Sequence, residues 1–298
     1  MKYIALSFFL FNVLFAAAQQ QKTEHLTVDS ISRRFEIYIP SASNTDKLPV
    51  LISLHGRLGT GRGMMGFAEF RSIAYREKFI IVCPDGVSKS WNDGRPTRAQ
   101  KKGINDVKFI DKLITYTLKT YNGDSSRVYV TGMSNGGFMA SRVACELSNR
   151  IAAIAVVGAS MDKNVSYHQN KAVPVMYIQG TKDPLVPYEG GAVKSSSGGD
   201  VYGHSEVLKL WAGVDHCDNS PVITNVPDNK GDGTSIIKEE YTNPSNSVKV
   251  VGYTITNGGH TWPGGTQYLP KFLIGPVSHN LNACEVIWDF FKGYRLVN

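Results

Sequence analysis

The stretch V-Y-V-T-G-M-S-N-G-G, Val128 to Gly137, decides how this sequence should fold. An apolar run that favours a strand leads into a glycine-rich turn, and residues 138–147 then favour a helix. In the turn, Gly132, Ser134 and Gly136 form the pattern G-x-S-x-G. Glycines two residues before and after the serine permit a tight turn that side chains would obstruct. We therefore predict that Ser134 is an exposed nucleophile at the start of a helix.

Buried strands and helices alternate on both sides of this turn. The runs at 49–55, 79–83, 151–157 and 173–179 are too continuously apolar for half-exposed strands. We expect further strands at 34–40, 236–241 and 248–256, and helices at 66–77, 104–121, from 204 onward and at 280–291. This order predicts an α/β protein with a mainly parallel central sheet and helices on both faces.

A serine hydroxyl needs a base, and His260 is the best candidate. It follows a strand and lies in the turn-rich sequence N-G-G-H-T-W-P-G-G, after Ser134 in the chain. His279 is the alternative base, although it precedes the last predicted helix rather than following a strand.

The acid that orients the histidine should lie between the nucleophile and the base, just after a strand. Asp183 has this position, directly beyond V-M-Y-I-Q-G-T-K. The other interpretation of Asp183 is a simple turn residue before Pro184. Asp215 and Asp218 are the rival acids.

Acyl transfer also requires two donors for the oxyanion. The amide of Asn135, next to the nucleophile, is expected to supply one. The loop L-H-G-R-L-G after an earlier strand should supply the other, from Arg57 or else Leu58. His55 is expected to fix this loop by hydrogen bonding.

Two tryptophans adjoin these motifs. Trp91 lies in S-W-N-D-G, and Trp262 lies two residues after His260. Each could stack on an aromatic or sugar group of a substrate, or each could pack in the core.

The amino terminus reads as a secretory signal peptide over residues 1–18. Lys2 precedes an apolar run from Ile4 to Phe15 and three alanines, and this run is shorter than the roughly 20 residues of a membrane span. We expect export to the periplasm or the extracellular space, and residues 19–298 to form a single catalytic domain with no stable membrane insertion.

Composition excludes some other classes of function. The formal charge is +7 without a dense Lys/Arg cluster, so we expect no nucleic-acid partner. No Cys/His spacing suggests a metal, and neither a metal nor an organic cofactor is expected. Of the four cysteines, Cys83 and Cys145 are expected to be buried thiols, and Cys217 with Cys284 to be the better candidates for a disulfide.

Taken together, the motifs resemble the extracellular polyhydroxybutyrate depolymerase and feruloyl esterase group, which includes acetylxylan-type carbohydrate esterases. The matching segments are L-H-G at 54–56, S-W-N at 90–92, T-G-M-S-N-G-G at 131–137, D-P-L-V-P-Y-E-G-G at 183–191 and G-G-H-T-W-P-G-G at 258–265. The resemblance implies an α/β-hydrolase fold and ester hydrolysis, with the triad at Ser134, Asp183 and His260.

The resemblance leaves the ester open. The sequence has no separate polymer-binding module or Ser/Thr-rich linker, which favours feruloyl or acetyl esters of plant cell-wall polysaccharide over aliphatic polyester. Two other interpretations are a serine peptidase of the same fold and a catalytically silent carbohydrate-binding protein. The oligomeric state does not follow from the sequence.

Overall fold

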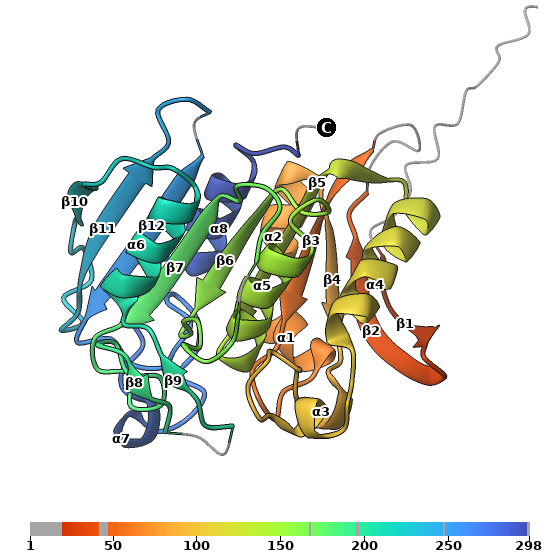
Figure 1. Cartoon of the computed structure of the whole chain (residues 1–298), viewed down its shortest axis with the longest axis horizontal. Coiled ribbons are helices and arrows are strands. Elements are labelled where there is room, and N and C mark those ends of the chain that lie inside the picture. Colours follow the sequence, from red (N-terminus) through yellow and green to blue (C-terminus); the bar gives the residue numbers. More distant parts are fainter. Residues whose placement is uncertain (1–19, 42–46, 167, 195–196, 247, 297–298) are drawn as a thin grey trace, which may run out of the picture.

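A ten-stranded sheet forms the centre of the computed structural model, which describes residues 20–41, 47–166, 168–194, 197–246 and 248–296 (Figure 1). The predicted signal peptide lies outside the described residues. The strands, in their order across the sheet, are β1 (Gln20–Val28), β2 (Ile31–Ile39), β4 (Ile80–Pro84), β3 (Leu48–Leu54), β5 (Gly123–Met133), β6 (Ala153–Val157), β7 (Val175–Gly180), β12 (Lys249–Thr256), β11 (Ser235–Thr242) and β10 (Val222–Val226). The strands from β4 to β12 run parallel, and antiparallel strands extend both edges.

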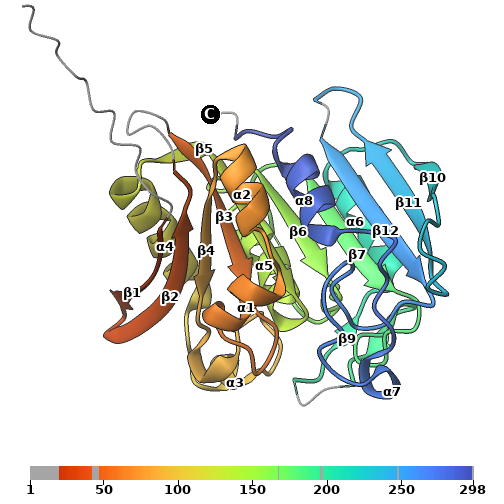
Figure 2. The ribbon, with the colours of Figure 1, turned by 180° about the vertical axis from the view of Figure 1, so that it is seen from behind.

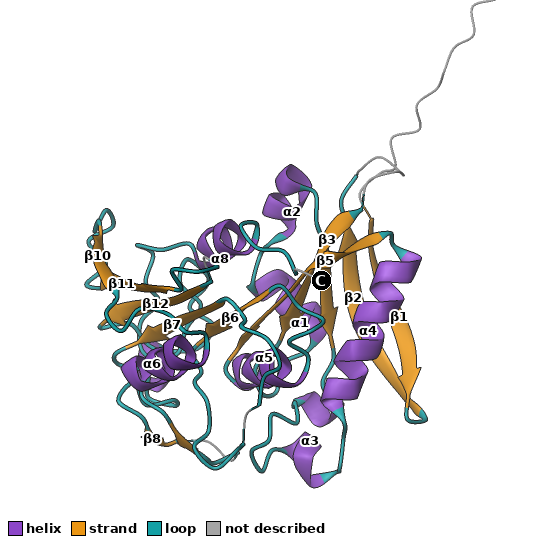
Figure 3. Cartoon of the chain, turned by 45° about the horizontal axis from the view of Figure 1, so that its top comes forward, coloured by secondary structure: helices purple, strands orange, loops and turns teal. Residues whose placement is uncertain are grey.

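Helices cover both faces of the sheet, as the sequence predicts. One face carries α4 (Asp106–Thr120), α5 (Asn135–Glu146) and α6 (His204–Val214), as Figures 1 and 3 show. The other face carries α1 (Gly61–Phe67), α2 (Arg71–Glu77) and α8 (Ala283–Phe291), seen from behind in Figure 2. The short elements are η1 (Val87–Lys89), α3 (Arg98–Lys101), α7 (Lys271–Ile274) and the small pair β8 (Gly191–Ala192) and β9 (Asp200–Val201). Of these, α3 and α7 lie beyond the carboxyl ends of the parallel strands, at the bottom of Figure 1.

Burial on both faces explains the continuous apolar runs of the central strands. Every residue of β3, β4, β6 and β7 is buried. The core on the α5 face includes Phe109 and Trp211, and the core on the α8 face includes Ile73 and Trp288. The Trp288 ring stacks on Phe79 with the ring centroids 3.7 Å apart. Because apolar surface contributes roughly 25 cal/mol per Å² removed from water, these two layers fix the sheet between the helices.

The secondary structure differs from the prediction at one helix and two strands. The helix expected at 66–77 is two helices, α1 and α2. Thr60 accepts from the Gly63 amide and starts α1 earlier in the chain, and Ala68, at ψ 87°, ends it before α2. The sequence also gave no expectation of β1 or β10. Both are edge strands with largely polar or exposed residues, so neither has the apolar run that marks a buried strand.

The predicted pairing of Cys217 with Cys284 is wrong, since all four cysteines are free thiols. Cys284 belongs to the core on the α8 face, whereas Cys217 packs against the core on the opposite face. The sheet therefore separates the two sulfur atoms. Cys83 and Cys145 are buried thiols as predicted, and burial raises the pKa of Cys145 to about 12. In the described ranges, none of the helices has the length and apolar character that a bilayer crossing requires.

Candidate active site

The turn between β5 and α5 has the strained geometry that the sequence predicts. Ser134 has φ 54° and ψ −123°, a conformation that non-glycine residues seldom adopt. A Cβ on Gly132 would lie 2.4 Å from the carbonyl of Gly136, and a Cβ on Gly136 would lie 2.2 Å from the carbonyl oxygen of Leu54. Ser134 is held by its own amide, which donates to the Val157 carbonyl at 2.9 Å. Positions 132 and 136 therefore admit only glycine.

His260 and Asp183 meet although 77 residues separate them in the chain. The Nδ1 atom of His260 donates to Oδ2 of Asp183 at 2.7 Å, and both side chains are buried. The other carboxylate oxygen, Oδ1, accepts from the amides of Leu185 and Val186, each at 2.8 Å. The carboxylate is thus fixed on both oxygens, and its bond to Nδ1 leaves Nε2 of the imidazole as the proton acceptor.

Close backbone packing brings the loops of this acid and base together. A Cβ on Gly180, at the end of β7, would lie 2.2 Å from the Gly258 carbonyl oxygen. A Cβ on Gly259 would lie 2.1 Å from the carbonyl oxygen of Ile274. Gly158, at φ 57°, leaves the space that the His260 ring occupies, because its Cβ would lie 3.2 Å from Nδ1. A side chain at Gly180, Gly259 or Gly158 would therefore push these loops or the His260 ring out of place.

Ser134 and His260 line the same pocket, whose volume is about 470 Å³. Its other walls include the loop at 55–60, α1, the segments at 185–186, 193–194 and 268–269, and Ser197. Nine apolar side chains line it: Leu58, Met64, Phe67, Met133, Phe138, Leu185, Val186, Val193 and Leu269. A pocket of this size and character suits a small organic ligand. Within the described residues, no group of three His, Cys, Asp or Glu side chains is arranged to hold a metal ion.

The loop after β3 lies beside the nucleophile, where the second oxyanion donor is expected. Arg57, the donor that the sequence favours in this loop, lines the pocket. The amide of the alternative donor, Leu58, is bonded to the Lys89 carbonyl at 2.9 Å. His55 fixes the loop as predicted: its Nδ1 donates to the Gly56 carbonyl at 2.7 Å, and its Nε2 accepts from the Gly86 amide at 2.9 Å. Burial lowers the pKa of His55, which keeps this ring neutral.

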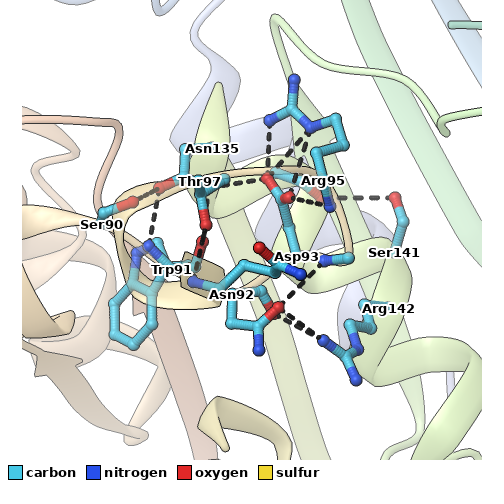
Figure 4. Close-up of polar contacts among 12 residues, drawn as sticks. Ser90, Trp91, Asn92, Asp93, Arg95, Thr97, Asn135, Ser141 and Arg142 are labelled. Atoms are coloured by element: carbon cyan, nitrogen blue, oxygen red, sulfur yellow. Dashed lines mark hydrogen bonds and ion pairs between the residues drawn. The ribbon is translucent and has the colours of Figure 1, made fainter. Parts of the chain in front are cut away.

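The side chain of Asn135 has a role that the sequence did not indicate. Its Oδ1 accepts from the Trp91 amide at 2.8 Å, and its Nδ2 donates to the Trp91 carbonyl at 3.1 Å and to Asp93 at 2.7 Å (Figure 4). Asp93 also forms a buried ion pair with Arg95, at 2.6 Å. The guanidinium of Arg95 lies 3.5 Å from the ring centroid of Phe138, at the pocket wall.

The structure corrects the prediction that Trp91 and Trp262 stack on substrate. Their exposed fractions are 0% and 1%, and neither lines the pocket. The Trp91 indole donates to the His55 carbonyl at 2.9 Å. The Trp262 ring packs edge-on against Phe67 and Phe70, with centroid distances of 6.2 Å for both pairs. Both indole rings therefore pack in the core. The aromatic residues that line the pocket are Phe67, Phe138 and Tyr268.

The rival acid and base residues lie away from this pocket. Asp215 is buried beyond α6, where it accepts from Gln169 and from the Val173 amide. Burial raises the pKa of Asp215 to about 7. The amide of His279 donates to Asp232, and neither His279 nor Asp218 lines the pocket.

The chain is similar to a family of hydrolases and to several esterases. A model of the Dienelactone hydrolase family matches residues 65–221. "Putative esterase NocK" of Nocardia uniformis subsp. tsuyamanensis is 26% identical over 255 residues, which cover 82% of this chain and 74% of that protein. "Feruloyl esterase B" of Neurospora crassa is 25% identical over 265 residues, which cover 80% of this chain and 87% of that protein.

A solved structure supports the fold alone. Acetyl xylan esterase from Aspergillus awamori aligns with a TM-score of 0.56 and 19% sequence identity, over 80% of this chain and 94% of that one. Its likeness bears out the α/β-hydrolase fold expected from the strand, turn and helix around Ser134.

Proposed function

The chain belongs to the dienelactone hydrolase family and is a carboxylic ester hydrolase, and from this premise we propose that it works through an acyl-enzyme on Ser134. The observation that carries the proposal is the 2.7 Å hydrogen bond between His260 and Asp183, at the pocket that Ser134 and His260 share. This arrangement has the components of a serine-histidine-acid triad.

In the proposed reaction, Oγ of Ser134 attacks the ester carbonyl carbon while Nε2 of His260 takes the hydroxyl proton. The amides of Asn135 and Arg57 stabilise the resulting oxyanion. When the tetrahedral intermediate collapses, the alcohol leaves with the proton from His260. Water then attacks the acyl carbon while His260 takes its proton. The second tetrahedral intermediate releases the carboxylic acid as His260 returns the proton to Oγ of Ser134. Asp183 stays ionised and stabilises the imidazolium.

Among the described residues, Ser134 and His260 both line the pocket, but no hydrogen bond joins their side chains. Such contacts are often long in a free enzyme and shorten in the Michaelis complex. In the proposed reaction, the imidazole or the hydroxyl therefore moves into hydrogen-bond distance when the substrate fills the pocket.

For the substrate, we favour a hydroxycinnamoyl ester such as a feruloyl group on plant cell-wall polysaccharide, with acetyl esters as the second choice. A pocket of about 470 Å³ is much larger than an acetyl group needs, and its aromatic and aliphatic walls match a planar aryl chain. The relative named as a feruloyl esterase spans most of this chain, which supports the same choice. We also propose that residues 1–18 direct export, which gives access to such a polymer.

A hydrolysis panel tests the substrate choice. The purified chain would be assayed with methyl ferulate, acetylated xylan, short hydroxybutyrate oligomers and an aryl amide, with Ser134→Ala as the blank. We expect the highest kcat/KM with methyl ferulate. A dominant rate on hydroxybutyrate oligomers would replace the proposed substrate by an aliphatic polyester, and a dominant rate on the amide would indicate a peptidase. Loss of all turnover in the wild-type chain would contradict the acyl-enzyme proposal itself.

A further inference from the structure

The Trp91 backbone pairs with the side chain of Asn135 at two points. The Trp91 amide donates to Oδ1 at 2.8 Å, and the Trp91 carbonyl accepts from Nδ2 at 3.1 Å (Figure 4). The side-chain amide of Asn135 therefore bonds both the N–H and the C=O of one residue, as a neighbouring strand does in a sheet. It fixes the orientation of Asn135, whose own backbone amide is one of the two proposed oxyanion donors.

The Trp91 side chain reaches the other donor loop. Its indole N–H donates to the carbonyl oxygen of His55 at 2.9 Å. The centroids of the Trp91 and His55 rings lie 5.0 Å apart. His55 stands two residues before Arg57, the second proposed donor. Since the ring of His55 is bonded to Gly56 and Gly86, the carbonyl that Trp91 holds belongs to a rigid segment.

We propose that Trp91 is a positioning residue that sets the distance between the two oxyanion donors, an inference that rests on the proposed acyl-transfer function. Trp91 joins the amino end of α5 to the loop after β3 through three hydrogen bonds, one from its side chain and two from its backbone. The two amides must both lie about 2.7–3.1 Å from one developing oxyanion, so a small shift of either loop weakens both bonds.

The surroundings of Trp91 are consistent with a fixed support. The indole is fully buried, and the Trp91 carbonyl also accepts from the Thr97 hydroxyl at 2.8 Å. Asp93 accepts from Asn135 and pairs with Arg95, so the far side of the Asn135 amide is held as well. Replacing the indole N–H would leave the buried His55 carbonyl without this donor, and the loop would relax toward another partner.

Trp91→Phe removes the N–H and keeps an aromatic ring, and Trp211→Phe is the matched control. Trp211 is also buried, with an exposed fraction of 1%, and its indole N–H donates to the Tyr177 hydroxyl at 2.9 Å, outside the pocket lining. For each variant we would measure kcat and KM with methyl ferulate and p-nitrophenyl acetate, the inhibition constant of an aryl boronic acid, and the melting temperature. The boronic acid forms a tetrahedral adduct with the serine and therefore reports on the oxyanion site.

For Trp91→Phe we expect kcat to fall about 10- to 100-fold with KM within about twofold, somewhat less than loss of a whole oxyanion donor. The affinity for the boronic acid should fall by the same factor as kcat/KM. Trp211→Phe should lower the melting temperature by a similar amount and leave all three kinetic constants unchanged. Should Trp91→Phe fold poorly, Trp91→3-benzothienylalanine keeps the bicyclic shape without the N–H and should give the same kinetic loss.

A folded variant at position 91 with wild-type kcat and wild-type boronic acid affinity would overturn the inference and leave the proposed function intact. An equal loss of kcat in Trp211→Phe would overturn it as well, because the effect would then follow stability. A wild-type chain that hydrolyses neither ester would overturn the proposed function first, which is a different result from either of these.

Discussion

The two sides of the pocket are built in different ways. On the nucleophile side, the loops after β3 and β4 are tied to α5 by polar side chains, chiefly Asn135 and Trp91. On the acid-base side, the ends of β7 and β12 meet through glycine backbones, with Gly180 against Gly258. The first arrangement depends on hydrogen bonds from particular side chains, and the second depends on the absence of side chains. Substitutions should therefore impair the two sides differently.

The largest expected effect is the loss of kcat in Asp183→Asn, which changes the chemistry of the acid and keeps its backbone contacts. In Asp183→Asn, Oδ1 still accepts from the amides of Leu185 and Val186, while an amide nitrogen faces His260. The imidazole is then held in the wrong tautomer, and kcat should fall roughly 10⁴-fold. Steady-state rates of the variant, with its melting curve as the control for folding, test this. A loss below tenfold would show that Asp183 is only a turn residue.

Gly180→Ala should break the acid-base side by a different route. The added Cβ would lie 2.2 Å from the Gly258 carbonyl oxygen, and a backbone atom cannot move aside cheaply. We expect the free energy of unfolding to fall by about 4 kcal/mol. The control is Gly66→Ala on the exposed side of α1, where nothing lies within 4 Å of the new Cβ and the helix should gain up to about 1 kcal/mol. Equal urea midpoints for the two variants would contradict the glycine account.

His204, at the start of α6 and close to Gly252 of β12, should make stability depend on pH. Its ring stacks on Tyr188, and neither ring nitrogen has a hydrogen-bond partner in the described ranges. Burial lowers the pKa of His204 from 6.5 to about 4. The unfolded chain takes up this proton below about pH 6.5 and the folded chain does not, so the contribution is complete above pH 6.5 and is lost as the pH falls toward 4.

The neutral His204 ring contributes about 3 kcal/mol to the free energy of unfolding above pH 6.5. This follows from the lowering of its pKa from 6.5 to about 4, at 1.36 kcal/mol for each unit. Urea unfolding of the wild-type chain and of His204→Phe at pH 7.5 and pH 4.5 isolates it from Asp215, whose pKa is raised and whose contribution has the opposite sign. The stability difference between wild type and variant should change by about 2.5 kcal/mol over this range, because pH 4.5 is still above the folded pKa. Parallel pH curves would rule out the buried neutral imidazole.

The smallest effect is expected at Trp262, close to His260 in sequence. Because its ring packs against Phe67 and Phe70 in the core, Trp262→Phe should cost about 1–2 kcal/mol of stability and leave kcat within about twofold. Chemical denaturation and steady-state kinetics check both parts. A large rise in KM with methyl ferulate would restore the prediction that Trp262 stacks on substrate.

The sequence predicted the positions that follow directly from strand ends. Ser134, Asp183 and His260 each come just after an apolar run, and parallel strands bring such positions to one edge of the sheet. The tight turn at Ser134 could also be predicted, because Gly132 and Gly136 permit a backbone that other residues would obstruct.

The orientation of the two tryptophans could not be read in the same way. Residue type shows that Trp91 has a large ring with one donor, but the acceptor at His55 is 36 residues away in the chain. The contact of Asn135 with Asp93 spans 42 residues and involves two ordinary polar side chains. Only the folded chain shows that these groups meet. The edge strands β1 and β10 were missed because pairing, and not an apolar run, defines them.

The most direct test of the account is covalent labelling of the folded wild-type chain with a fluorophosphonate, followed by intact mass and peptide mapping. The account predicts one adduct, on Ser134, that forms in the native state and is absent in Ser134→Ala. It also predicts slower labelling in Asp183→Asn, since the hydroxyl then lacks an oriented base. A folded chain that hydrolyses esters but carries the adduct at another residue, or carries none, would contradict the assignment of Ser134 as nucleophile.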